Sequence, residues 1–262
     1  MTERLPTDAA QLFVVTGLPG SGKQRFAAFL SEHLDLKEWR DDENNADDSG
    51  FFAIDRGIQP PFQAFEEPEG YSCRVLCVVD ARSEPPRTEG QWVYQRLDSL
   101  LQSSDALVLA FADEVSLLDH NRWSLFIKHN YPDIKVLRWG RHGLDSMQFL
   151  SPPMNLQDKL QHWQAAQMQV LHFQLGKVVL DHLVMVLDNA RRSLGMQIYR
   201  AKGVFHTLEY ENLVALEAGV ERIDTYAADN QDFDQSGLGK LCLQGIDLDS
   251  SWLESMLHAC RV

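Results

Sequence analysis

Short apolar runs and longer amphipathic segments alternate through the first 150 residues. Runs rich in β-branched and other apolar side chains predict buried strands, and they occur at 11–17, 51–55, 74–81, 106–113 and 133–139. Apolar residues at helical spacing predict helices at 23–34, 91–105 and 119–130. Strands alternating with helices of this length predict an α/β domain, with a mostly parallel sheet covered on both faces.

The pattern changes at a proline- and glutamine-rich stretch, 151–167, which contains Pro152 and Pro153 and predicts a linker. Beyond it, strand-like runs dominate, and we expect a small α+β domain with its helices on one face of a sheet. The predicted organisation is a first domain at 1–150, the linker, and a second domain at 168–262. The strand-like segments of the second domain are 168–180, 197–210, 212–228 and 240–247, and its helices are 181–194 and 250–260.

Charge and hydropathy narrow the classes of partner. The net charge is −14, from 38 acidic and 24 basic residues. An acidic field of this size repels nucleic acid and anionic membranes, so neither is an expected partner. No apolar run approaches the ~20 residues of a membrane span, and the first residues lack the basic flank and apolar core of a secretory signal. We therefore expect a cytoplasmic protein.

The cysteines do not form a metal-binding pattern. Cys73, Cys77, Cys242 and Cys260 contain no CxxC pair with a matching partner, and the nine histidines are scattered. Thiolate and imidazole clusters select zinc and cobalt, so the sequence predicts neither a cysteine zinc site nor a cobalt site. Buried thiols in a reducing compartment are the expected state.

One segment has the pattern of a phosphate-binding loop. "GLPGSGKQ" follows a predicted strand and opens a predicted helix, so its N–H groups and the helix dipole converge on one point, to which Lys23 adds a full charge. The alternative is a loop that survives only as a turn at the start of a helix. We expect a nucleotide's phosphates to be bound by Gly17, Leu18, Pro19, Gly20, Ser21, Gly22, Lys23 and Gln24, with Lys23 also catalytic.

Gln24 stands where such loops usually carry Ser or Thr. That hydroxyl is a compact ligand for Mg²⁺, which requires near-octahedral geometry at ~2.1 Å, and the Gln carbonyl lies two carbons further from the backbone. Binding can survive this change because the amides and Lys23 do most of the holding. Hydrolysis depends on the metal that neutralises charge between the β and γ phosphates. The sequence therefore predicts that the loop binds a nucleotide, that Mg²⁺ is bound weakly, and that hydrolysis is slow or absent.

Two acidic residues that end predicted strands are candidate ligands for Mg²⁺. Asp55 either holds Mg²⁺, directly or through water, and so takes part in catalysis, or it caps the following turn. Asp80 has the same alternatives, with the structural one favoured. Arg56 is either a built-in arginine finger or, as the favoured alternative, a surface arginine paired with nearby acids.

Six segments together resemble one family, the CobW-like P-loop GTPases, which are metallochaperones. They are "VVTGLPGSGK", "FFAIDRGIQPP", "VLCVVDAR", "LQSSDALVLAFAD", "YRAKGVF" and "KLCLQGIDLDSSWLESMLHAC". The resemblance implies a bound purine nucleotide, GTP or GDP with ATP as the other candidate. It also implies a role near metal homeostasis or metalloenzyme maturation. Arg200 and Lys202 in the fifth segment are expected to form a polar sheet face, the alternative being a contact with a protein partner or across the domains.

The chain departs from that family at the residues that read the base. Ala110, Phe111 and Ala112 replace the first three residues of the guanine-reading Asn-Lys-x-Asp, and Asp113 remains. The resemblance implies that Asp113 accepts from the guanine ring, and we expect discrimination between guanine and adenine to weaken. The family's Cys-x-Cys-Cys motif is missing, so the residues contradict the metal-transfer role that the resemblance implies.

Three functions remain. The first is a divergent GTP-binding protein, and the second is a pseudo-GTPase that acts as a protein-interaction module with its nucleotide structural or absent. A small-molecule kinase is disfavoured because no lid-like arginine cluster is visible and the second half resembles a non-kinase domain.

The missing cysteine motif leads to a prediction about zinc. Titration of the full chain with Zn²⁺ is expected to give no site with a dissociation constant below roughly one micromolar, since soft ligands are not clustered. Competition against a chromogenic zinc chelator measures this. A stoichiometric site that outcompetes the chelator at submicromolar zinc would contradict the prediction.

Overall fold

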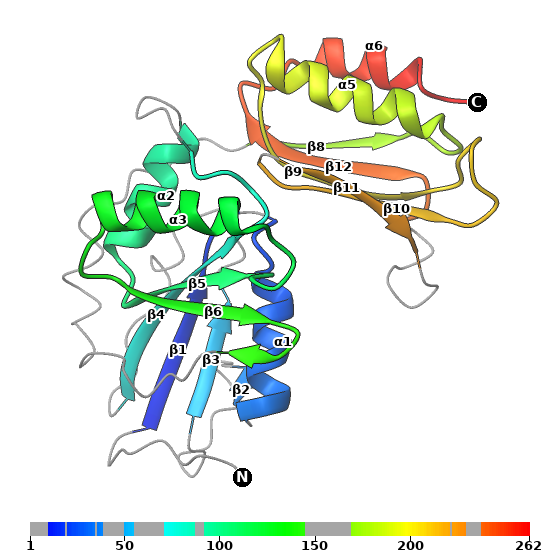
Figure 1. The fold of residues 1–262 in the computed structure, drawn as a ribbon. Helices are drawn as coiled ribbons and strands as arrows, with labels where there is room; N and C mark the ends of the chain where they lie inside the picture. Colours follow the sequence, from blue (N-terminus) through cyan, green and yellow to red (C-terminus); the bar gives the residue numbers. More distant parts are fainter. Residues whose placement is uncertain are drawn as a thin grey trace. The chain divides into compact units, whose positions relative to one another are not determined.

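The computed structural model describes residues 10–18, 20–34, 36–38, 50–54, 71–86, 92–144, 169–220, 222–228 and 237–262. The chain divides into two compact units, Met1–Ala165 and Ala166–Val262 (Figure 1). The expected linker lies outside the described residues, as do Pro19, Asp55 and Arg56. The domain limits 1–150 and 168–262 therefore stay predictions.

The N-terminal unit contains a mostly parallel sheet, as the sequence predicts. Its strand order is β2-β3-β1-β4-β5-β6-β7, and among the strands that the structure describes only the β6–β7 pair is antiparallel. The two shortest strands, β2 and β7, were not predicted because two residues carry no periodic signal. The strands are β1 Ala10–Thr16, β2 Lys37–Glu38, β3 Gly50–Ile54, β4 Tyr71–Asp80, β5 Ala106–Ala110, β6 Lys135–Gly140 and β7 Gly143–Leu144.

Helices cover both faces of this sheet. Helix α1 (Lys23–Leu34) buries Phe26 and Leu30 in one apolar cluster, while α2 (Trp92–Gln102) and α3 (Leu117–Asn130) contribute to a second cluster. Strand β4 supplies alternate residues to the two clusters, because successive side chains of a strand point to opposite faces. The sheet is thus a buried layer, and its carboxyl edge is where connecting loops can form a site.

The predicted strand 106–113 is too long. Strand β5 ends at Ala110, because Phe111 adopts a left-handed backbone conformation with φ +59° and the chain turns there. The turn continues through Asp113. This correction moves Asp113 from a strand into a loop.

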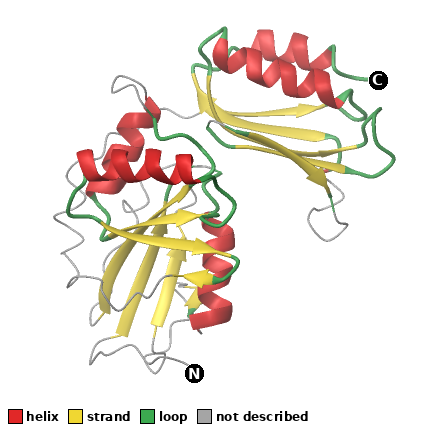
Figure 2. Cartoon of the chain, in the orientation of Figure 1, coloured by secondary structure: helices red, strands yellow, loops and turns green. Residues whose placement is uncertain are grey.

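The C-terminal unit contains an antiparallel sheet in the order β11-β10-β9-β12-β8. Helices α5 (Leu180–Arg192) and α6 (Ser250–His258) pack on one face, as predicted (Figure 2). The strand-like segment 212–228 is two strands rather than one, since the chain reverses after Ala218. The strands are β8 Gln169–Gln174, β9 Gln197–Phe205, β10 Val214–Ala218, β11 Ile223–Ala227 and β12 Lys240–Ile246.

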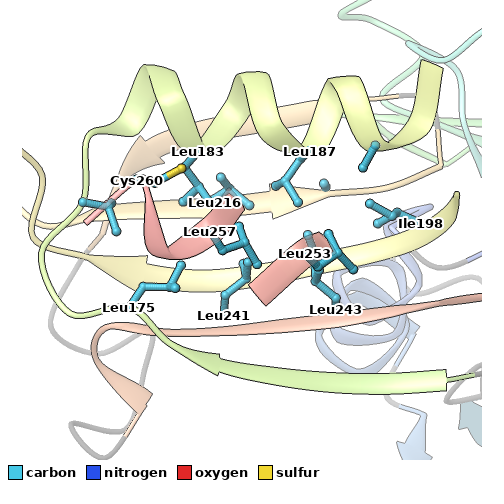
Figure 3. Packing of buried hydrophobic residues seen from close by; sticks show 14 of the residues in the cluster. Leu175, Leu183, Leu187, Ile198, Leu216, Leu241, Leu243, Leu253, Leu257 and Cys260 are labelled. Atoms are coloured by element: carbon cyan, nitrogen blue, oxygen red, sulfur yellow. The ribbon is translucent and has the colours of Figure 1, made fainter. Parts of the chain in front are cut away.

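The core of the C-terminal unit lies between the two helices and the sheet (Figure 3). Leu183 and Leu187 come from α5, and Leu253 and Leu257 from α6. All four side chains are fully buried against strand residues such as Leu241. The core therefore joins elements from both ends of the unit's sequence. Within the described residues, no helix combines the length and the apolar character needed to cross a membrane.

Truncating one of these leucines is expected to destabilise the unit. Leu187→Ala removes a fully buried side chain and should lower the free energy of unfolding by about 2–5 kcal/mol. Met185→Ala on the same helix removes a side chain that is 62% exposed and should change it by about 0.5 kcal/mol or less. Urea denaturation of the full chain, followed by circular dichroism, compares the two. Equal effects of both substitutions would contradict the core assignment.

Candidate functional site

The glycine loop lies between β1 and α1, at the carboxyl edge of the parallel sheet. Gly17, Gly20 and Gly22 have φ values of +148°, +81° and +90°, which L-residues rarely adopt. A Cβ at Gly17 would lie 2.2 Å from the carbonyl oxygen of Val78, on the neighbouring strand β4. The loop therefore needs glycine at this position both for its dihedral angles and for its close approach to β4.

Lys23 and Ser21 place polar groups inside this loop. Lys23 is 9% exposed, and its Nζ donates to the carbonyl oxygens of Gly17 (2.5 Å) and Leu18 (3.3 Å). Ser21 is 5% exposed, and among the described residues its Oγ has no hydrogen-bond partner. A buried hydroxyl without a partner costs about 1–3 kcal/mol. An oxygen-bearing ligand in the loop would relieve that cost.

Gln24 follows Lys23 in the first turn of α1 and is exposed. The loop's predicted residues are thus brought together, from Gly17 and Leu18 through Gly20 to Gln24, with Pro19 outside the described residues. Asp55, the predicted metal ligand, also lies outside them.

Phe111 contacts the glycine loop. A Cβ at Gly22 would lie 3.1 Å from its ring, and Phe111 itself is buried. The guanidinium of Arg82 lies 3.8 Å from the ring centroid and that of Arg25 lies 5.1 Å from it, both within the range of cation–π attraction. The sequence identified Phe111 only as a lost base reader. Its position after a buried strand at the carboxyl edge was the available signal for a role beside the loop.

Asp80 ends β4 and is held by Arg82. Its Oδ1 accepts from the backbone N–H and the Nε of Arg82, both at 2.9 Å, and its Oδ2 accepts from Nη2 at 2.8 Å. Arg82 also reaches Glu114, with 3.3 Å between Nη1 and Oε2. These contacts correspond to the structural alternative for Asp80. Sequence reasoning missed Arg82, although it stands two residues after the strand-end acid.

Asp113 is engaged with the turn between β6 and β7. Its Oδ2 accepts from the backbone N–H of Arg141 at 2.8 Å, and this hydrogen bond holds the pKa of the carboxyl below its ordinary value. A Cβ at Gly140 would lie 2.4 Å from the Oδ1 of Asp113. At least one of its oxygens is therefore committed to the protein's own backbone. Its predicted contact with a base stays a prediction.

A hollow of about 430 Å³ opens beside this turn. It lies between the start of α3 and the β6–β7 hairpin, and Asp113, His120, Arg138 and His142 are among the residues that line it. Within it, the Nε2 of His120 lies 2.7 Å from the carbonyl oxygen of Ala112, which ties α3 to the turn after β5. The hollow and the glycine loop thus share the carboxyl edge of one sheet.

The described residues contain no group of three or more His, Cys, Asp or Glu side chains that could hold a metal ion. Cys77, Cys242 and Cys260 form no disulfide in this part of the chain. Burial raises the pKa of the Cys242 and Cys260 thiols above its ordinary value.

Comparison with known proteins identifies the C-terminal unit. Residues 168–261 match the family model of the cobalamin synthesis protein CobW C-terminal domain. A comparison with curated proteins gave no match.

Among solved structures, the chain is similar to the Zn(II)-bound YjiA GTPase from E. coli and to a Zn(II)-bound triple mutant of YjiA GTPase. The identities are 14% and 13%, the TM-score is 0.36 in both cases, and each match covers 98% of this chain and 100% of the other. At this level of similarity, the roles of residues in YjiA cannot be assigned to residues of this chain. The family match thus concerns residues 168–261, and the N-terminal unit has the mostly parallel sheet that the resemblance to the CobW-like P-loop GTPases implies.

Proposed function

We propose that this chain binds a purine nucleotide, GTP or GDP, at residues 17–24 and hydrolyses it slowly or not at all. The observation that carries the proposal is the geometry of the loop. Three glycines with positive φ surround a buried ammonium and a buried hydroxyl that has no partner among the described residues. Phosphate oxygens would satisfy both groups.

The positive charge of the loop favours an anionic ligand, although the net negative charge of the whole chain repels anions. The net charge is −14, so a nucleotide needs local cations. Lys23 supplies one within the loop, and Arg25 lies over the ring of Phe111, which touches Gly22. The guanidinium of Arg82 lies over the same ring but is already paired with two carboxylates. On binding, the Lys23 ammonium would exchange carbonyl partners for phosphate oxygens. Charge-assisted hydrogen bonds of this kind are roughly twice as strong as neutral ones.

Slow hydrolysis follows from the residues around the terminal phosphate position. Gln24 replaces the usual hydroxyl ligand of Mg²⁺, and Asp80 is paired with Arg82. Phosphoryl transfer relies on positioning and on neutralising charge between the β and γ phosphates. With the usual hydroxyl ligand of Mg²⁺ replaced by Gln24, the bound nucleotide should turn over slowly.

The residues that follow β5 support weak selection among purines. Ala110 and Ala112 have no side-chain hydrogen-bonding groups, and Phe111 offers only an aromatic ring. Asp113 accepts from the backbone of Arg141. Discrimination of guanine from adenine requires hydrogen-bonding groups that the wrong base leaves unpaired. We therefore place ATP beside GTP as a possible ligand.

The match of the C-terminal unit to the CobW C-terminal domain supports a role near metal homeostasis or metalloenzyme maturation in the cytoplasm. In this role the protein would act on a protein partner and would not itself carry zinc or cobalt.

A second candidate is a pseudo-GTPase that works as an interaction module. One observation favours it: a polar row crosses the sheet of the C-terminal unit on the face opposite α5 and α6. Neighbours in register are His172 with Cys242, Cys242 with Lys202, and Lys202 with Glu217. The Lys202 Nζ lies 3.3 Å from Glu217 Oε1. Such a face can be recognised by a protein of complementary charge.

Calorimetric titration of the full chain with GDP, GTP and ATP tests the proposal. Lys23→Ala removes the buried ammonium and should weaken binding by roughly tenfold or more, the equivalent of about 1.5–3 kcal/mol for a charged hydrogen bond. Lys128→Ala, an exposed lysine on α3, is the control and should leave affinity unchanged. The ratio of guanine to adenine affinity should stay below about tenfold.

Absence of saturable binding to the folded native chain would show that the loop is only a helix-start turn and would favour the interaction module. Multiple turnovers of GTP at rates typical of enzymes, about 1 per second or faster, would contradict slow hydrolysis.

A further inference from the structure

The start of helix α1 concentrates positive charge beside the glycine loop. Its first turn contains Lys23 and Arg25 and no acidic residue. The aligned peptide dipoles already place a partial positive charge at the N-terminus of a helix, so cations there are unfavourable until an anion binds. The hydroxyl of Ser21, buried and without a hydrogen-bond partner among the described residues, lies in the same loop. These features together indicate that an anion binds at this turn.

Arg25 carries a charge that no carboxylate neutralises within the part of the chain that the structure describes. Its side chain is exposed and takes part in no ion pair there, and its guanidinium lies 5.1 Å from the ring centroid of Phe111. The other arginine over this ring, Arg82, is bound by Asp80 and Glu114. Of the two guanidinium groups, that of Arg25 is therefore the one available to a ligand.

Phe111 holds the guanidinium of Arg25 close to the loop. The ring of Phe111 packs on Gly22, where an added Cβ would lie 3.1 Å from it, and Phe111 is itself buried. Cation–π attraction acts within about 6 Å of a ring centroid. The side chain of Arg25 is thus kept on the flank of the loop, although it is exposed to solvent.

The backbone N–H of Arg25 is a further donor at this turn. The hydrogen bond that joins the helix to the loop runs from the N–H of Phe26 to the carbonyl oxygen of Gly22, at 3.0 Å. The N–H groups before it, at the start of a helix, have no carbonyl partner within the helix and point toward an incoming anion. Arg25 therefore combines a main-chain donor with a full positive charge, and both groups suit a phosphate.

We propose that Arg25 is a second phosphate-binding cation of the glycine loop and that Phe111 is the residue that positions it. Lys23 and Arg25 together bind a pyrophosphate group, so the site takes purine diphosphates and triphosphates, and inorganic pyrophosphate, mainly through their phosphates. A guanidinium suits this task because it can bind two phosphate oxygens at once while it packs on an aromatic ring. The inference rests on the proposed function, since it concerns the same loop.

Titration calorimetry of the full chain with GDP and with inorganic pyrophosphate, in one buffer that contains Mg²⁺, tests the phosphate contact. Arg25→Gln should weaken both ligands by about the same factor, roughly fivefold or more. Arg25→Lys keeps a charge but not the planar fork, and it should lose less affinity than Arg25→Gln for both ligands. Lys128→Gln makes the same change in net charge at an exposed site on α3 and should leave both affinities within about twofold of the native values.

The melting temperature of the ligand-free chain separates binding from a structural role. Arg25→Gln loses a cation–π contact and relieves a repulsion with the helix dipole, two effects of similar size and opposite sign. Its melting temperature should therefore stay within about 3 °C of the native value, while the rise that pyrophosphate produces becomes smaller. A lower melting temperature together with native affinity for pyrophosphate would show that Arg25 is only structural and would overturn the inference.

The positioning role of Phe111 is tested by a double-variant cycle. Phe111→Leu removes the aromatic ring but keeps an apolar side chain beside Gly22, and it should weaken pyrophosphate binding by roughly two- to threefold. In the Arg25→Gln background the same change should leave affinity unaltered, because the guanidinium that the ring orients is gone. An equal loss in both backgrounds would show that Phe111 acts by packing on the loop alone and would overturn its positioning role.

The outcomes distinguish this inference from the function on which it rests. GDP binding that Arg25→Gln leaves unchanged would overturn the inference and leave the proposed function standing. A loss confined to GDP would place Arg25 at the base or ribose, and native binding of GDP without pyrophosphate would exclude recognition mainly through the phosphates; either result would overturn the inference alone. Absence of saturable binding of both ligands to the folded native chain would overturn the proposed function, and with it the phosphate role of Arg25.

Discussion

The close approach of Gly17 to the carbonyl of Val78 is the constraint on which the site depends. It holds the glycine loop against β4, so that the loop, the end of β4 and the turn after β5 lie at one edge of the sheet. A side chain at Gly17 would push the loop away from its neighbours. The positions of Lys23 and Ser21 follow from this contact, because the loop closes around them over a few residues.

A second set of contacts ties the loop to its surroundings. Phe111 packs on Gly22, Arg82 packs on Phe111, and Asp80 and Glu114 bind Arg82. Phe111, one of the places where the chain departs from the CobW-like pattern, therefore contacts both the glycine loop and Arg82. A change in Phe111, Arg82 or either acid would alter the charge or packing beside the loop.

The C-terminal unit is stabilised mainly by the burial of apolar side chains. Its helices and antiparallel sheet enclose a continuous leucine-rich core, and the opposite face carries paired polar residues such as Lys202 and Glu217. This unit matches the CobW C-terminal domain as a whole, whereas the divergent residues of the loop lie in the N-terminal unit. The match to the CobW C-terminal domain and the departures at Gln24 and Phe111 are thus found in separate parts of the chain.

The sequence by itself determined the parallel sheet of the first domain, the α+β character of the second, the helices on their faces and the glycine loop, because periodicity and glycine spacing are local properties of the chain. Tertiary structure alone decided that the guanidinium of Arg82 binds both carboxylate oxygens of Asp80 and that Asp113 accepts from the backbone N–H of Arg141. The left-handed turn at Phe111, which ends β5 early, was likewise invisible in an apolar run. These features depend on which strands are neighbours, as when Asp80 lies in register with Ala110, and a pattern along the chain does not record the distance between residues on different strands.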